Sequence, residues 1–282
     1  ILGWKPDPAH KRLSGIFGHE LVLGSFLARL IPLGFFVLAS IPRLKSWMVI
    51  LGLCFLIAVD VLIYLAGERV GFFYLMLGTV LIIVLISRFR WLRFFTFLAS
   101  SLVIIVLTIT LPQVKSRMVD QTISDFGLNN TTKSFHIFTP THEEHYTNAL
   151  KMFYDNPIFG QGPKLFRYLC NKPEFYPTKI ENQTRGCSTH PHNTYIQLLS
   201  ELGIVGTLPV LGLFLYLIYL FGKQFFSLYF KRKDPLFNDP QICLLIMMFI
   251  SLWPLVPTGN FFGNSLNIFY YLPIGFYLYK TS

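Results

Sequence analysis

Long apolar stretches recur along the chain, and shorter polar connections separate them. Each stretch is close to the roughly 20 residues that an α-helix needs to cross a bilayer. They lie at 21–42, 47–66, 71–87, 94–112, 194–221, 241–257 and 262–279. The pattern predicts an all-α polytopic membrane protein of about seven transmembrane helices, with four helices in residues 1–112, a large loop at 113–193 and three helices in residues 194–282.

Composition agrees with lipid as the solvent for most of the chain. Of its 282 residues, 53% are hydrophobic and only 13% are charged. A soluble domain of this size cannot bury so much apolar surface, so the composition excludes an ordinary water-soluble enzyme.

Basic residues predict how the helices are oriented. They gather in alternate connections, which the positive-inside rule assigns to the cytoplasm. These residues are Arg43, Lys45, Arg88, Arg90, Arg93, Lys223, Lys231, Arg232, Lys233 and Lys280. Residues 1–20, the turn at 66–71 and the loop at 113–193 are therefore expected to face outward. The net charge of +10 then reflects membrane topology in part, rather than a nucleic-acid-binding surface.

The loop at 113–193 has the chemistry of a soluble domain and holds five of the seven histidines, including His136. Within it, Thr141 and Glu144 have the spacing of a capping box, which predicts the start of a helix. One apolar face of this amphipathic helix would consist of Tyr146, Ala149, Leu150, Phe153 and Tyr154. Asp155-Asn156-Pro157 predicts its end.

Two further pairs in the loop have alternative interpretations. His142 and His145 suggest zinc, but they are three residues apart rather than four, which favours an exposed first helical turn and no metal. Cys170 and Cys187 bracket a polar segment, and they either close it as a disulfide or remain two thiols.

His192 and Asn193 stand where the loop ends and an apolar helix begins. Asn193 is a good N-cap, because its side-chain oxygen can accept hydrogen bonds from the first turn. His192 then lies just outside the positive end of the helix, which disfavours imidazolium and favours a neutral, proton-accepting ring. This pattern indicates a general base at a membrane boundary; the alternative is a surface histidine that only helps to cap the helix.

Arg12 and Arg69 are expected on the same outer face as His192. A guanidinium group suits a bidentate grip on phosphate and stays charged in a partly dry cleft. The alternative for each is an arginine that reaches out to lipid headgroups. Their convergence with a histidine on a face poor in cations favours the functional interpretation.

Arg29 and Asp60 lie inside predicted spans, where ionisable residues are rare. Their similar predicted depth favours a structural ion pair. The alternative is a charged path through the membrane, as in a transporter of polyprenyl-linked or other anionic lipids.

The run His192-Asn193, nine residues, Gly203, two residues and Gly206 resembles the signature of the O-antigen ligase and O-antigen polymerase superfamily. The segments around Arg12 and Arg69 look like that family's two outer-face arginines. The resemblance implies a GT-C-like glycosyltransferase in the bacterial inner membrane that needs no cofactor. His192 would be its catalytic base, and Arg12 and Arg69 would bind the diphosphate of the donor.

The resemblance also implies the substrates. An O-antigen ligase transfers a glycan from undecaprenyl diphosphate to a hydroxyl of lipid A-core on the periplasmic face, and needs no nucleic acid. Polymerases of O-antigen or exopolysaccharide, and relatives that glycosylate proteins, share these motifs and remain alternatives. Because family members begin with several further spans, we expect this chain to be an amino-terminally truncated fragment.

Overall fold

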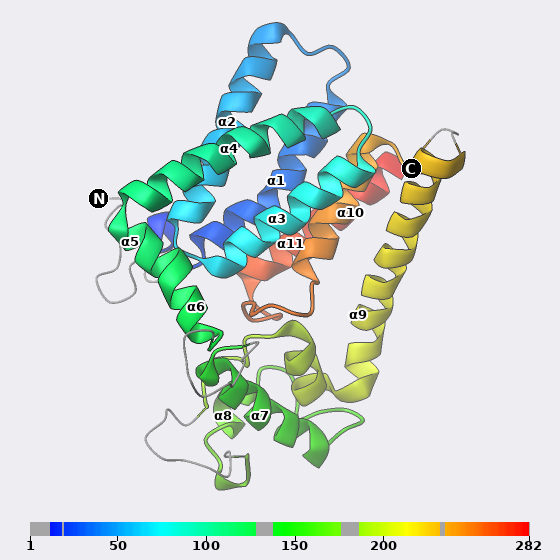
Figure 1. Ribbon diagram of the computed structural model, residues 1–282. Coiled ribbons are helices and arrows are strands. Elements are labelled where there is room, and N and C mark those ends of the chain that lie inside the picture. Colours follow the sequence, from blue (N-terminus) through cyan, green and yellow to red (C-terminus); the bar gives the residue numbers. More distant parts are fainter. Residues whose placement is uncertain (1–11, 19, 128–137, 176–185, 232–234, 282) are drawn as a thin grey trace. The chain divides into compact units, whose positions relative to one another are not determined.

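A computed structural model describes residues 12–18, 20–127, 138–175, 186–231 and 235–281 (Figure 1). Within these ranges the chain is helical, without a β-strand. Seven helices lie where the apolar pattern predicts them: α1 (Leu23–Ser40), α2 (Ser46–Leu65), α3 (Arg69–Leu85), α4 (Arg90–Thr110), α9 (Thr194–Phe226), α10 (Asp239–Ser251) and α11 (Asn264–Thr281). The predicted all-α class is confirmed.

Four helices in the described part of the chain are long and apolar enough to cross a membrane: α1, α2, α4 and α9 with its continuation to Phe230. The helices α3 and α10 are apolar but shorter. These helices identify a polytopic membrane protein. The predictions that concern residues 1–11, His136, Arg232 and Lys233 lie outside the described residues, as does the side chain of Lys280.

The chain divides into two compact units, and each is described by itself. Unit 1 comprises Ile1–Thr122, Leu220–Ser251 and Pro273–Ser282. In it, α1 packs against α3 and α10, and α2 packs against α4 (Figure 1). Unit 2 comprises Ile123–Tyr219 and Leu252–Leu272, so it holds most of the long loop and the beginning of α9.

A buried ion pair joins α2 to α4 inside unit 1. The guanidinium of Arg93 donates to both carboxylate oxygens of Asp60, at 2.9 and 3.0 Å, and both side chains are fully buried. Ser100 donates a third hydrogen bond to Asp60 at 2.9 Å, and Thr79 accepts from the Nε of Arg93 at 3.1 Å. Every charged group of the pair therefore has a partner, as burial requires.

The predicted pairing of Arg29 with Asp60 is therefore wrong. Arg29 instead donates to the carbonyl of Ser25 at 3.2 Å and lies over the ring of Tyr74, 4.3 Å from its centroid. The prediction placed Arg93 in a cytoplasmic connection, whereas α4 begins at Arg90 and carries Arg93 into the protein. Depth along a span does not reveal which face of the helix carries the charge.

The long loop contains several short helical elements. They are α5 (Pro112–Lys115), η2 (Ser116–Asp120), α6 (Gln121–Asp125), α7 (Pro140–Asp155), α8 (Phe166–Leu169) and η3 (Pro173–Phe175). Only α7, which was predicted, is longer than five residues. Two details of that prediction are wrong.

The first is the start of α7, because Thr139 is the N-cap rather than Thr141, and Pro140 occupies the first helical position. Proline is favoured there because that N–H has no partner within the helix. The second is the buried face, since Tyr154 is 73% exposed. The buried residues are His145, Tyr146, Asn148, Ala149 and Met152. Apolar residues alone could not locate this face because two of its members are polar.

Candidate active site

The break in α9 sets the geometry of the candidate site. Gly203 has φ 63° and ψ −163°, so the helix divides there into residues 194–202 and 204–226. A Cβ at Gly203 would collide with the backbone of Ile158, and a side chain is strained at this φ. The sequence predicted an uninterrupted span from 194 to 221, so the break corrects that prediction. Gly206, the other glycine of the motif, leaves space for the side chain of Leu202 one turn earlier.

The segment 157–162 fills this break with its backbone. The approach is so close that a Cβ at Gly160 would lie 2.5 Å from the carbonyl carbon of Glu201. Four backbone hydrogen bonds join the segments: Ile204 N to Pro157 O (2.9 Å), Val205 N to Ile158 O (3.2 Å), Gln161 N to Ser200 O (2.9 Å) and Gly162 N to Glu201 O (2.9 Å). Backbone groups freed by the break are thereby satisfied, which an interrupted helix in a membrane protein requires.

Asn193 caps the amino-terminal end of α9, as the sequence predicts. Its Oδ1 accepts from the backbone N–H of Tyr195 at 3.0 Å and of Ile196 at 3.1 Å. Its Nδ2 donates to the carbonyl of Pro254 at 2.8 Å, and the side chain is buried. The cap therefore also attaches the start of α9 to the segment that precedes α11.

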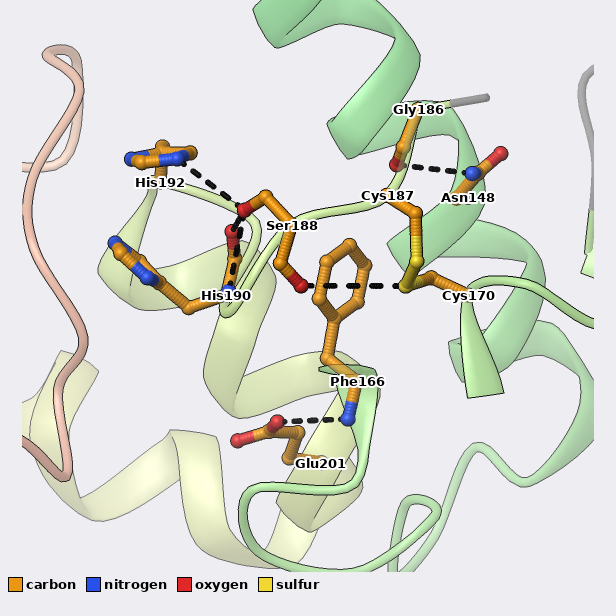
Figure 2. The surroundings of a disulfide bond; sticks show 9 residues. All are labelled: Asn148, Phe166, Cys170, Gly186, Cys187, Ser188, His190, His192 and Glu201. Carbon is orange, nitrogen blue, oxygen red and sulfur yellow. Dashed lines mark hydrogen bonds between the residues drawn. A yellow bond between two sulfur atoms is a disulfide. The ribbon is translucent and has the colours of Figure 1, made fainter. Parts of the chain in front are cut away.

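His192 precedes this cap in a left-handed backbone conformation, with φ 58°. Its carbonyl accepts from the N–H of Thr258 at 2.8 Å, which holds the backbone in place. Its Nε2 lies 3.3 Å from the hydroxyl oxygen of Ser188 (Figure 2). A non-glycine residue at positive φ is uncommon, and such positions often occur at functional sites.

Three further imidazoles surround His192 within unit 2. The centroid of its ring lies 4.1 Å from that of His190, 5.4 Å from that of His145 and 5.5 Å from that of His142. His142 and His145 come from α7, whereas His190 comes from the same loop as His192. We call these four residues the histidine cluster. His190 lies outside the matched run of residues 192–206, and the contact of its ring with His192 brings it into the site.

Burial and mutual repulsion keep two members of the histidine cluster neutral at pH 7. Burial lowers the pKa of His192 to about 3, helped by the charges that His190, His142 and His145 would carry. Burial likewise lowers the pKa of His190 to about 4, against a raising effect of the hydrogen bond to the carbonyl of Thr258. A neutral imidazole carries one lone pair that can accept a proton.

The loop beside the cluster is fastened by a disulfide between Cys170 and Cys187, whose Cα atoms are 5.3 Å apart. Figure 2 shows how this bond lies next to Ser188, which follows Cys187 in the chain. A small apolar core packs around it, formed by Ala149, Met152, Phe166, Cys170 and Phe175, with Leu169, Cys187 and Ile196 against it. The disulfide thus anchors the segment that carries His190 and His192 to the core below α7.

Sequence reasoning missed a buried polar network on the first segment of α9. Glu201 is fully buried and accepts from the backbone N–H of Phe166 at 3.0 Å (Figure 2) and from Gln197 at 3.0 Å. Gln197 also donates to Asn260 at 2.8 Å and accepts from Phe261 N at 2.9 Å. The only sequence signal was the polar spacing of Gln197 and Glu201 within an apolar run.

The two candidate diphosphate-binding arginines lie in unit 1. Arg12 donates to the carbonyl of Leu21 at 2.5 Å, and its buried Nε has no hydrogen-bond partner within the described ranges. Burial lowers the pKa of Arg12, while the carboxylate of Glu68 raises it and Arg69 lowers it further. Arg69 is the first residue of α3.

Glu68 and Arg117 join this arginine pair, and the sequence did not single them out. The carboxylate of Glu68 is buried and accepts from the backbone N–H of Ser25, near the start of α1, at 2.8 Å. Arg117 donates through its Nε to the carbonyl of Gly67 at 3.0 Å. Both contacts fix the turn that leads into Arg69.

The predicted site residues are thus divided between the two units. Arg12 and Arg69 belong to unit 1, whereas His192, Asn193 and Gly203 belong to unit 2. Convergence of the arginines with His192 in one cavity therefore stays a prediction. Among the described residues, no group of three or more His, Cys, Asp or Glu side chains is arranged to hold a metal ion.

Comparison with known proteins bears on the family. No curated protein matches the chain. A family model described as O-Antigen ligase matches residues 52–211, which is more than half of the chain and includes Arg69, the disulfide and the whole run from His192 to Gly206. The chain therefore belongs to the O-antigen ligase family of membrane glycosyltransferases.

Proposed function

We propose that this protein transfers a glycan from undecaprenyl diphosphate to a hydroxyl group of lipid A-core, on the periplasmic face of the bacterial inner membrane. The observation that carries the proposal is the state and position of His192. It is a neutral imidazole, held at positive φ directly before a capped helix that begins the longest candidate span. That is the form and place in which a histidine can accept a proton from an attacking hydroxyl.

His192 is the general base in this proposal. A sugar hydroxyl is a poor nucleophile until its proton is removed, and a positioned base contributes about 10²–10⁴-fold to the rate. The oxygen of the hydroxyl attacks the anomeric carbon of the donor glycan, and the bond from that carbon to the diphosphate oxygen breaks. The proton passes to His192, and the lipid diphosphate departs with the bonding electrons.

Arg12 and Arg69 neutralise the departing diphosphate. The buried Nε of Arg12, which has no hydrogen-bond partner among the described residues, supports this role, because phosphate oxygens are suitable acceptors for a guanidinium N–H. Glu68 balances part of the positive charge and raises the pKa of Arg12 against the lowering effect of burial. Electrostatic stabilisation of this kind is often the largest contribution to catalysis. No cofactor is needed for this chemistry.

A transporter is the alternative from another class, and it requires charged groups along a path through the membrane. The intramembrane charges of α2 and α4 are instead matched to each other: Asp60 and Arg93 form a bidentate pair with further hydrogen bonds from Ser100 and to Thr79. This arrangement favours a structural role for those charges and therefore favours the enzyme.

The test is a purified assay with an undecaprenyl-diphosphate-linked glycan, in the presence and absence of lipid A-core. We expect the glycan to be transferred to lipid A-core. Lengthening of the donor glycan without lipid A-core would instead identify a polymerase. Appearance of the glycan on a protein hydroxyl would identify a protein-glycosylating relative. Absence of any transfer, with movement of intact donor lipid across vesicles, would favour the transporter.

A further inference from the structure

The hydroxyl of Ser188 contacts both histidines of the motif loop. It donates to the carbonyl of His190 at 2.6 Å and accepts from the backbone N–H of His190 at 3.2 Å. The same oxygen lies 3.3 Å from the Nε2 of His192 (Figure 2). Ser188 therefore links the backbone of one histidine to the ring of the other.

These contacts determine the direction of the third hydrogen bond. A serine hydroxyl has one proton and two lone pairs. The proton is directed at the carbonyl of His190, which can only accept, and one lone pair takes the N–H of His190. The remaining lone pair faces His192, so the Nε2 of His192 must be the donor. A neutral ring protonated at Nε2 carries its lone pair on Nδ1.

Ser188 is also held firmly in place. Cys187 precedes it and forms the disulfide with Cys170, whose side chain is fully buried in the core below α7. Thr258 holds the carbonyl of His192 from the other side at 2.8 Å. The hydroxyl and the ring are thus fixed by separate anchors, which limits their relative motion.

We propose that Ser188 is a positioning residue that holds His192 in the Nε2-protonated tautomer, so that Nδ1 is the atom that accepts the proton of the attacking hydroxyl. The inference rests on the proposed function, in which His192 is the general base. When Nδ1 takes the proton, Nε2 continues to donate to Ser188, and Ser188 continues to donate to the carbonyl of His190. This chain of dipoles presents its negative end to the ring and stabilises the imidazolium that forms.

Nitrogen-15 NMR of the histidine side chains tests the tautomer without measuring activity. The sample is the full chain with labelled histidine at pH 7, and the His192 signals are those lost in His192→Gln. We expect a protonated Nε2 and an unprotonated Nδ1, and we expect Ser188→Ala to give a mixture of the two tautomers. A wild-type ring protonated at Nδ1, or an unchanged spectrum in Ser188→Ala, would overturn the inference.

Kinetics provide a second test, in the lipid A-core assay. Ser188→Ala should lower kcat about 10- to 100-fold, because it removes one hydrogen bond to a group that becomes charged, with the donor KM little changed. Ser188→Thr keeps the hydroxyl and should restore most of the lost rate. The matched control is Thr189→Ala, because the hydroxyl of Thr189 contacts the Nδ1 of His190 at 2.9 Å rather than His192.

The two tests separate this inference from the proposed function. If His192→Ala retains near-normal transfer, the proposed base is wrong, whatever Ser188 does. If His192→Ala is inactive but Ser188→Ala has the wild-type kcat, only the positioning role is wrong. An equal loss of kcat in Ser188→Ala and Ser188→Thr, with a lowered melting temperature in both, would also contradict it, because that pattern indicates damage to the loop.

Discussion

At the scale of single residues, the environment of His192 determines how it can act. Burial is the main reason for its low pKa, and His190, His142 and His145 add to it. The sequence predicted the direction of this shift but assigned it to the helix dipole. A ring with such a pKa is neutral throughout the physiological range, so its lone pair is available to a proton from the substrate.

The pH dependence of activity follows from this environment. Only the neutral ring accepts a proton, so kcat/KM should rise with pH through the pKa of His192. That pKa is lowered to about 3, which predicts a nearly constant kcat/KM between about pH 6 and pH 8. Bound diphosphate stabilises imidazolium, so the midpoint in kcat should be higher than that in kcat/KM. A kcat/KM that rises with pH within this range would contradict His192 as the base with this pKa.

Arg69→Lys tests the role of the second arginine. Lysine keeps the charge but loses the planar fork that grips two phosphate oxygens. We expect the donor KM to rise about 10-fold, because at least one charge-assisted hydrogen bond is lost, while the melting temperature of the purified protein stays near that of the wild type. Donor kinetics at saturating acceptor measure the effect. An unchanged donor KM would indicate that Arg69 contacts only lipid headgroups.

Local sequence patterns revealed some of these residues and hid others. Asn193 could be predicted because an N-cap is a local interaction between a side chain and the next turn. His145 and Ser188 could not, because their proximity to His192 depends on how α7 and the disulfide-bonded loop fold back. His190 is only two residues from His192, but it lies outside the matched run, and nothing in the sequence indicated that the two rings are in contact.

At the scale of helices, the interruption of α9 is the feature on which the site depends. The segment 157–162 enters the break with its backbone, and Gly160 and Gly203 permit the approach. Nine residues lie between Asn193 and Gly203 in the motif. They form the first segment of α9, from the start of the helix to its break. Hydrophobicity alone could not reveal the break, because the apolar run continues through it.

Gly203→Ala tests whether the break in α9 requires a glycine at this position. A side chain at φ 63° is strained, and the new Cβ would meet the backbone of Ile158. We expect a loss of about 1–3 kcal/mol or more in stability, observed as a lower melting temperature in detergent. The matched control is Gly212→Ala in the same helix, where a Cβ has nothing within 4 Å. That change should be neutral or slightly stabilising, and equal effects of the two changes would contradict the interpretation.

The ion pair between α2 and α4 can be tested by a double-mutant cycle. Removing either Asp60 or Arg93 leaves a fully buried charge without its partner, which costs about 3–5 kcal/mol. Asp60→Leu combined with Arg93→Met should therefore destabilise less than the sum of the single changes, as measured by unfolding in detergent. The cycle of Asp60→Leu with Arg29→Met is the control and should be additive. Additive effects in the first cycle would mean that Asp60 and Arg93 have no interaction energy with each other.

Much of the fold was predictable because the length and apolarity of membrane helices make them recognisable in a sequence. The seven helix positions are of this kind, and the structure agrees with them to within a few residues, except that α9 breaks at Gly203 and continues to Phe226 and that α10 ends at Ser251. The partner of Asp60 and the buried face of α7 were not predictable. Both depend on packing between helices that are distant in the sequence, and the charge on Arg93 gave no sign that it was buried.

At the scale of the whole molecule, the residues of the proposed function are divided between two units. Unit 1 carries the arginines that we propose bind a diphosphate, and unit 2 carries the histidine cluster, in which His192 and His190 are neutral. In the proposed function, donor binding and proton transfer therefore depend on different residues. Removing the base should leave the donor site intact, whereas removing an arginine should not.

The most direct test measures donor binding and glycan transfer on the same preparation of His192→Ala in lipid nanodiscs. The account predicts that transfer to lipid A-core falls about 10²–10⁴-fold, while the Kd for the undecaprenyl-diphosphate-linked donor stays within a few-fold of the wild-type value. Near-normal transfer, or an equal loss of donor binding and transfer, would contradict the assignment of His192 as the general base.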